Sequence, residues 1–262
     1  MGGARTLLLT GKPDKQPILQ TAIGDEQRRA ADRPLPGIQA LVGTDWITVD
    51  DAYGAQMAER ERLLAERPHE VLACLSDAHA PARELLEQVL KVLADRPDFT
   101  VLPDSVQRPD GQSVPLDRAN PLRTLGSLVS EDLCLLQKIG DTHVLTAAVL
   151  CFPASWTLAE KIGKPLIGVH APVAAYDAAL AGRVQRLFDG VKPGRPIWRA
   201  NLLGYKDPDL FQPRSENARR QRDESAEIYE RSERQVIWRL PETNAVVFTI
   251  HTSVALARPD ST

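Results

Sequence analysis

Apolar runs in the second half of the chain predict five β-strands. Two runs, Asp132–Gln137 and Val144–Phe152, flank a glycine-containing turn at Lys138–Thr142, so we expect a β-hairpin there. Three further strands follow, and the turn Pro241–Asn244 joins the last two. Their predicted bounds are Pro196–Tyr205, Glu233–Leu240 and Ala245–Val254.

Apolar residues at helical spacing predict two helices before the hairpin and two after it. The capping residues Thr48–Asp51 precede a helix that runs to about Arg67, and Pro81 precedes a second helix from Ala82 to about Ala94. After the hairpin we expect a short helix over Trp156–Ile162, in which Trp156 packs, and a longer helix over about Ala174–Asp189. The longer helix has an apolar and aromatic face made of Tyr176, Leu180, Val184, Leu187 and Phe188.

The order of these elements indicates an α+β fold. Five mostly antiparallel strands with helices inserted after the second resemble a PAS-type sheet, which encloses a ligand between its concave face and the inserted helices. We expect an extended or partly disordered arm over residues 1–45, a helical extension over 46–100, a PAS-like domain over 120–256 and a tail over 257–262. The charged segment 212–229 predicts a solvated helix or mobile loop, with a lid as the alternative.

Composition argues against a nucleic-acid or membrane role. The 262 residues are 43% hydrophobic and 26% charged, which allows a sizeable core. A net charge of -3 gives no basic footprint for nucleic acid, and no apolar run approaches the roughly 18 residues that a membrane span needs. Cys74, Cys134 and Cys151 form no CxxC pair and the N-terminal segment is a weak signal peptide, so we expect a cytoplasmic protein.

His170 is the residue for which the sequence suggests a chemical role. Common motifs of hydrolases, nucleotide-binding enzymes and zinc sites are absent. His170 stands between the apolar segments Leu166–Val169 and Ala171–Val173, just before the longer helix. A neutral imidazole in an apolar cavity suits the proximal side of a haem iron. A hydrogen-bonded core histidine is the alternative, and His69 and His79 are expected to be surface or core-edge residues.

Several blocks of sequence follow one another in order over roughly residues 46–256. The blocks are Glu131–Leu135, Ala147–Pro153, Trp156, Glu160–Gly163, Pro165–Leu166, His170–Val173, Glu233–Gln235, Arg239–Pro241 and Val247–Ile250. Together they resemble the haem-dependent oxidative N-demethylase family. The resemblance implies a PAS-fold subunit that binds b-type haem and uses O2 to remove a methyl group from a secondary amine such as dimethylamine. It also implies electrons from flavin and iron–sulfur partners, and His170 as the axial haem ligand.

Charged residues stand in the third and fourth strands, where a sheet core is usually apolar. Alternation places Arg199 and Asn201 on one face of the third strand, and Glu233 and Gln235 on one face of the fourth. If this face lines the cavity, the groups can polarise bound oxygen or hold an ammonium substrate. Glu233 is then the candidate amine partner, and Arg234 the candidate cation for a haem propionate or for oxygen. Pairing with each other or with solvent is the alternative.

The predicted site therefore contains five residues. The catalytic candidates are Glu233, Arg234 and Arg199. The candidates for cofactor binding are His170, Tyr176 and Arg234, with His170 as the metal ligand.

Two positions depart from the family pattern. Leu202–Leu203 stand where the family commonly carries Trp, and His251 stands where it commonly carries Arg. Both differences leave the identity of the amine open. His251 shares the more polar face of its strand and is expected to be solvated, with a second ligand role left open. Glu131 and Lys161 are expected to form an anchoring pair at the base of the hairpin, with catalysis as the alternative.

The sequence thus predicts haem-dependent oxidative N-demethylation of a small secondary or substituted amine. Oxygen would bind opposite His170, and formaldehyde would be a product. Because the chain has no cysteine cluster for an iron–sulfur centre and no nucleotide motif, the reductase is expected to be a separate partner. The alternatives are a haem-binding gas or redox sensor, a haem carrier, and a haem-free binding scaffold.

Overall fold

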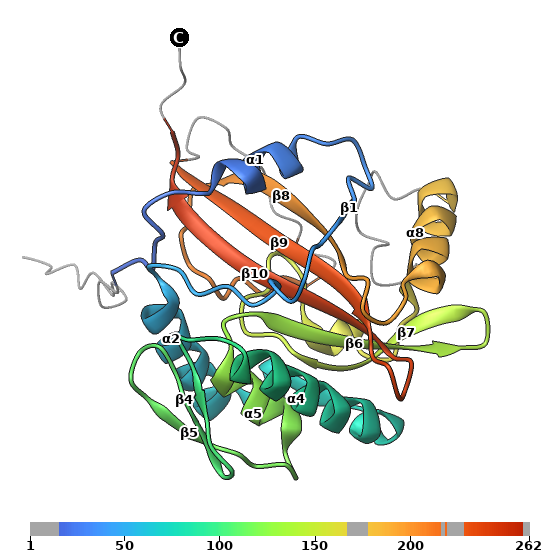
Figure 1. The fold of residues 1–262 in the computed structure, drawn as a ribbon. Helices are drawn as coiled ribbons and strands as arrows, with labels where there is room; N and C mark the ends of the chain where they lie inside the picture. Colours follow the sequence, from blue (N-terminus) through green and yellow to red (C-terminus); the bar gives the residue numbers. More distant parts are fainter. Residues whose placement is uncertain (1–15, 167–177, 216–217, 219–227, 259–262) are drawn as a thin grey trace, which may run out of the picture.

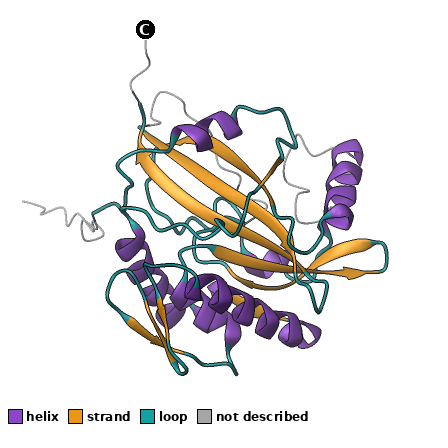
Figure 2. Cartoon of the chain, in the orientation of Figure 1, coloured by secondary structure: helices purple, strands orange, loops and turns teal. Residues whose placement is uncertain are grey.

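A long antiparallel sheet organises the part of the chain that the computed structural model describes, which is residues 16–166, 178–215, 218 and 228–258. Its seven strands lie in the order β1-β8-β9-β10-β6-β7-β2, and every neighbouring pair is antiparallel. Figure 1 shows α2, α4 and α5 gathered along one side of this sheet, with α1 and α8 on other sides. Figure 2 shows the same helices in purple beside the orange strands.

The five long strands correspond to the five predicted from apolar runs. The strands β6 and β7 form the predicted hairpin, whose turn contains Gly140 at a φ of 59°. A positive φ at this turn suits glycine, which lacks the Cβ that would clash. The bounds are β6 Asp132–Ile139, β7 Thr142–Val149, β8 Ile197–Tyr205, β9 Tyr229–Arg239 and β10 Val246–Leu256.

The predicted number of strands in the sheet is wrong, because two short strands extend it at its edges. The strand β1 (Gln39–Ala40) pairs with β8, and β2 (Leu72–Cys74) pairs with β7. Strands of two or three residues are too short to show a hydrophobic period. Residues 100–115, for which no element is predicted, form a second antiparallel sheet of β3 (Thr100–Val101), β4 (Ser105–Gln107) and β5 (Ser113–Pro115).

All four predicted helices have a counterpart among the described residues. The first two correspond to α2 and α4, and the two after the hairpin correspond to a single-turn α6 and to α8. None of the helices in the described ranges is long and apolar enough to cross a membrane. The helices are α1 Asp25–Ala31, α2 Tyr53–Glu66, α3 Pro68–Val71, α4 His79–Ala94, α5 Pro121–Leu128, α6 Leu158–Lys161 and α8 Ala178–Gly190, with a 3₁₀ turn at Ser76–Ala78.

Both faces of the sheet are buried, each under a different set of helices. In β6, Leu133 and Leu135 belong to the core that contains residues of α2, α4 and α5, whereas Cys134 and Leu136 belong to a core with residues of α6 and α8. We call these the α2 face and the α8 face. Since successive side chains in a strand point to opposite faces, strands covered on both sides read as continuous apolar runs.

A buried ion pair joins helix α2 to the start of β6. Arg60 and Asp132 are both fully buried, and Arg60 Nη1 donates to Asp132 Oδ1 at 2.7 Å. Asp132 also accepts the backbone N–H groups of Cys151 and Phe152, at 2.6 Å and 2.9 Å. Arg60 donates further to the carbonyls of Gly126 and Ser130. One carboxylate and one guanidinium therefore connect α2, α5, β6 and the end of β7.

Replacing Asp132 is expected to destabilise the protein strongly. The Asp132→Asn substitution leaves Arg60 charged and buried without a counterion, a loss of about 3–5 kcal/mol in the free energy of unfolding. Urea denaturation followed by circular dichroism measures this loss. The control is Glu87→Gln, which breaks an ion pair with Arg118 in which both side chains are 50% exposed. Its cost should stay below about 1 kcal/mol, and equal costs for both variants would contradict the expectation.

Candidate functional site

Two of the five predicted site residues lie outside the described part of the chain. They are His170 and Tyr176, between α6 and α8. Their roles stay predictions. The other three, Arg199, Glu233 and Arg234, lie on β8 and β9, where their directions and contacts can be followed.

Four polar side chains meet on the α8 face, as alternation along the strands predicts. In the register of β8 and β9, Arg199 lies opposite Gln235, and Asn201 lies opposite Glu233. Ile237, two residues further along β9, belongs to the core under α6 and α8, which identifies the face. All four side chains are half-buried. We call Arg199, Asn201, Glu233 and Gln235 the polar array.

Neutral amides separate the two charges of the polar array. Glu233 Oε2 accepts hydrogen bonds from Asn201 Nδ2 at 3.1 Å and from Gln235 Nε2 at 2.9 Å. The other end of the Gln235 amide, Oε1, accepts from Arg199 Nη1 at 2.8 Å. Arg199 Nε donates to the carbonyl of Pro36 at 3.1 Å. Gln235 therefore bridges a guanidinium and a carboxylate that do not touch.

Within the described ranges, this separation leaves both charges of the polar array without a direct ion pair. Burial lowers the pKa of Arg199, and the negative charge of Glu233 opposes this effect only in part. Among the described residues, neither Arg199 nor Glu233 has an ion-pair partner. A half-buried charge without a counterion is costly, because no ion pair offsets the hydration free energy that the charge loses on burial. The polar array can therefore accept a cation at Glu233 and an anion at Arg199.

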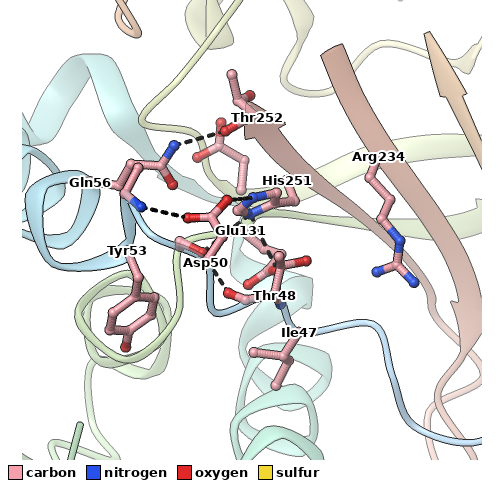
Figure 3. A network of polar contacts seen from close by, with 12 residues as sticks. Ile47, Thr48, Asp50, Tyr53, Gln56, Glu131, Arg234, His251 and Thr252 are labelled. Atoms are coloured by element: carbon pink, nitrogen blue, oxygen red, sulfur yellow. Dashed lines mark hydrogen bonds and ion pairs between the residues drawn. The ribbon is translucent and has the colours of Figure 1, made fainter. Parts of the chain in front are cut away.

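Arg234 lies on the opposite face from Glu233, so the two residues do not share one cavity. In the sheet register Arg234 is paired with His251, on the α2 face. Its guanidinium lies over the ring of Trp198 at 5.3 Å and donates to the carbonyl of Asp45 at 2.7 Å. Figure 3 shows it directed away from His251, towards the loop that contains Ile47. Glu233 and Arg234 are consecutive in β9, and consecutive side chains of a strand point to opposite faces.

The expectation that His251 is solvated is wrong. Its side chain is only 2% exposed and lies between two carboxylates (Figure 3). His251 Nε2 is 3.1 Å from Asp50 Oδ2, whereas Nδ1 is 3.3 Å from Ser130 Oγ and 3.6 Å from Glu131 Oε1. Alternation identifies the face of β10 correctly, but residues 44–51 cross that face and cover it. A sequence pattern cannot show which distant segment covers a strand.

Glu131 contacts the same segment and does not form the expected pair with Lys161. Its carboxylate is fully buried, and Oε1 accepts the backbone N–H of Thr48 at 2.6 Å. The second oxygen, Oε2, has no hydrogen-bond partner. Burial raises the pKa of Glu131, and the nearby charge of His251 and the Thr48 N–H oppose the rise. Sequence reasoning missed this cluster, for which the adjacent acidic residues Asp50 and Asp51 were the only local signal.

None of the described histidines is arranged as a haem ligand. Both ring nitrogens of His251 are engaged, and His69 and His79 are exposed. His143 is buried, but its Nδ1 accepts from Gln185 Nε2 at 2.9 Å, which places its proton on Nε2. No group of three or more His, Cys, Asp or Glu within the described ranges could hold a metal ion. The expected axial ligand remains His170.

Comparison with known proteins identifies the family of the chain. A family model described as haem-dependent oxidative N-demethylase, alpha subunit-like, matches residues 37–258. The match spans most of the chain and includes the polar array and His170. None of the curated proteins compared with the chain matches it.

Proposed function

Because the chain belongs to the haem-dependent oxidative N-demethylase, alpha subunit-like family, we propose that it binds b-type haem and demethylates a small secondary or substituted amine with O2. The family description supports haem dependence, an oxidative reaction and assembly with other subunits. Dimethylamine-like substrates and electrons from a separate flavin and iron–sulfur reductase are further parts of the proposal. A PAS-like architecture is another, supported by the central strand order β7-β6-β10-β9-β8 with α6 and α8 inserted after β7.

The observation that carries the proposal is the pair of separated charges on the α8 face. Haem carries two propionate groups, which are anions, and a small aliphatic amine is an ammonium ion in water at neutral pH. The polar array offers a guanidinium for an anion and a carboxylate for a cation, held apart by the Gln235 amide. The array therefore offers a cation for the haem propionates and an anion for the ammonium ion. Electrostatic groups that are fixed in advance act most strongly where water is excluded.

Each residue of the proposed site has a distinct task. Bound haem would be held by His170 and Tyr176 and would supply oxygen activation and electron transfer. Glu233 binds the ammonium through Oε1, since Oε2 already accepts two amide hydrogens. The same carboxylate can take the proton that the ammonium loses before oxidation. Arg199 holds a propionate or the oxygen side, a role for which Arg234 faces the wrong side of the sheet.

The His170→Ala substitution is expected to abolish haem binding without unfolding the protein. Protein titrated with haem should show a stoichiometric Soret band, and the band should be lost or strongly shifted in the variant. Circular dichroism checks that the variant is folded. The control is His79→Ala, which removes an exposed histidine and should leave the band unchanged. An unaltered Soret band in His170→Ala would exclude His170 as the ligand, and no band in the wild type would exclude haem binding.

The Glu233→Gln substitution is expected to weaken amine binding about tenfold or more. It keeps the shape of the side chain and removes the charge, and a hydrogen bond to a charged group contributes about 1.5–3 kcal/mol. Titration with a panel of small amines, followed by the shift of the haem absorption, gives the dissociation constant. The control is Glu230→Gln, the same change on the same strand but on the α2 face, where Glu230 pairs with Arg28. Equal affinities in all three proteins would remove Glu233 from the amine site.

The same titration separates the enzyme from its nearest alternative. A haem sensor or haem carrier would bind haem but show no amine-dependent shift. For the enzyme, exposing the amine-bound protein to O2 together with a chemical donor of the two electrons that the reductase would supply should give formaldehyde, the demethylated amine and water. A haem-bound protein that releases neither formaldehyde nor the demethylated amine would favour the sensor or carrier.

A further inference from the structure

Residues 44–51 cross the α2 face of the sheet, and we call them the strap. The strap is attached to three strands in turn. The carbonyl of Asp45 accepts from Arg234 of β9, and Trp46 packs against Trp238 of the same strand with the two rings tilted and their centroids 5.2 Å apart. Asp50 binds His251 of β10. The attachment at the start of β6 is made through Thr48, whose N–H donates to Glu131 and whose carbonyl accepts from Ser130 Oγ at 3.2 Å.

Both ring nitrogens of His251 face a carboxylate, and this arrangement favours a proton on each. Nε2 lies 3.1 Å from Asp50 Oδ2, which has only acceptor oxygens when ionised, so Nε2 donates there. Nδ1 lies 3.6 Å from Glu131 Oε1 and 3.3 Å from Ser130 Oγ, and the same hydroxyl lies 3.2 Å from the carbonyl of Thr48. When Nδ1 carries a proton, Ser130 is left to donate to Thr48 in the strap. When Nδ1 is bare, Ser130 has a second acceptor, and a bond to Nδ1 would be made at the expense of the bond to Thr48.

We propose that His251 is a proton-operated clasp, which holds the strap against the sheet when both ring nitrogens carry a proton and loosens it when one is lost. Histidine is the side chain whose charge ordinarily changes between pH 5 and pH 8. This inference concerns the α2 face and does not depend on haem or on the amine.

Among the described residues, His251 is the one cation within ion-pair distance of Asp50 and Glu131. Other charged and titratable groups face this region from β9, α2, the start of β6 and the end of α4, but each has a partner of its own. Arg234 is bound to Asp45 and Trp198, Arg60 to Asp132, and Arg96 to Asp98, although the charges of Arg60 and Arg96 also reach Glu131. The Tyr53 hydroxyl donates to the carbonyl of Leu128 at 3.0 Å. A deprotonated His251 would leave Asp50 and Glu131 without their ion-pair partner.

The pKa values of the two carboxyls are shifted in opposite directions. Burial would raise the pKa of Asp50, but the hydrogen bond and charge of His251, together with the hydrogen bonds from Gln20 and Ala52, outweigh burial and leave this pKa below its ordinary value. The stabilisation from Asp50 is therefore complete above the ordinary pKa and is lost as the pH falls through the lowered one. The pKa of Glu131 is raised by burial, so this carboxyl ionises at a higher pH than an exposed one, and its charge lacks an ion-pair partner only when His251 has lost its proton. We therefore expect the clasp to be closed above the pH at which Asp50 takes up a proton and below the pH at which His251 loses one.

Hydrogen–deuterium exchange of the peptide 44–52 tests the clasp. The peptide contains the Thr48 and Ala52 N–H groups, which donate to Glu131 and Asp50. After correction for the intrinsic pH dependence of exchange, its protection factor should fall at least about tenfold between pH 5 and pH 9 in the wild type. A peptide from α4 should keep its protection. A constant protection factor for the peptide 44–52 would overturn the proposal.

Substitutions of His251 separate its proton from other titrations. His251→Gln cannot carry the charge and should leave the strap weakly protected at every pH in this range. His251→Arg stays cationic and should remove the pH dependence while keeping the protection. The control His143→Gln replaces a second histidine that is buried in the described part of the chain and binds Gln185 near the tip of the β6–β7 hairpin, and it should retain the wild-type profile. A wild-type profile in His251→Gln would contradict the clasp.

A variant at Asp50 gives an independent test if substitutions at His251 prevent folding. Asp50→Asn removes one of the two carboxylates that favour the imidazolium. The midpoint of the pH-dependent loss of protection should therefore move to lower pH than in the wild type. An unchanged midpoint would show that Asp50 does not hold the proton of His251, and the proposal would be wrong.

Discussion

The ion pair between Arg60 and Asp132 is the contact on which the arrangement of the sheet and its helices depends. Both groups are inaccessible to water, so their attraction is weakly screened and neither can be lost without stranding the other. Because Asp132 also holds the backbone of Cys151 and Phe152, the pair fixes where β7 ends as well as where α2 lies. Glu131 directly precedes Asp132 in the chain, so the ion pair also positions Glu131 on the α2 face.

The sheet places two different groups of polar side chains on its two faces. On the α8 face, amide side chains keep Arg199 and Glu233 apart and leave each able to bind a charged guest. On the α2 face, a histidine brings two carboxylates of distant segments together. One face is suited to binding small charged molecules, and the other fixes the chain. Neighbouring residues such as Glu233 and Arg234 therefore belong to different parts of the molecule.

The sequence predicts what depends on short-range periodicity and fails where distant segments meet. The five long strands were recognised because both faces are buried and their apolar runs are continuous. The polar array was anticipated because a period of two fixes which side chains share a face. The edge strands β1 and β2 were missed because a few residues carry no period. The solvated position expected for His251 is wrong because nothing near it in the sequence reveals the strap, and the contact between Glu131 and Thr48 is hidden from the sequence for the same reason.

The strap also has a consequence for the order in which the molecule assembles. Its partners Glu131, Arg234 and His251 become neighbours only after β6, β9 and β10 have paired, and up to about two hundred residues separate the strap from them in the chain. Contacts of such high sequence separation form slowly, because closing a long loop costs conformational entropy before the contact can stabilise the chain. The strap should therefore dock late in folding, and a chain still being synthesised cannot complete this face until β10 has emerged.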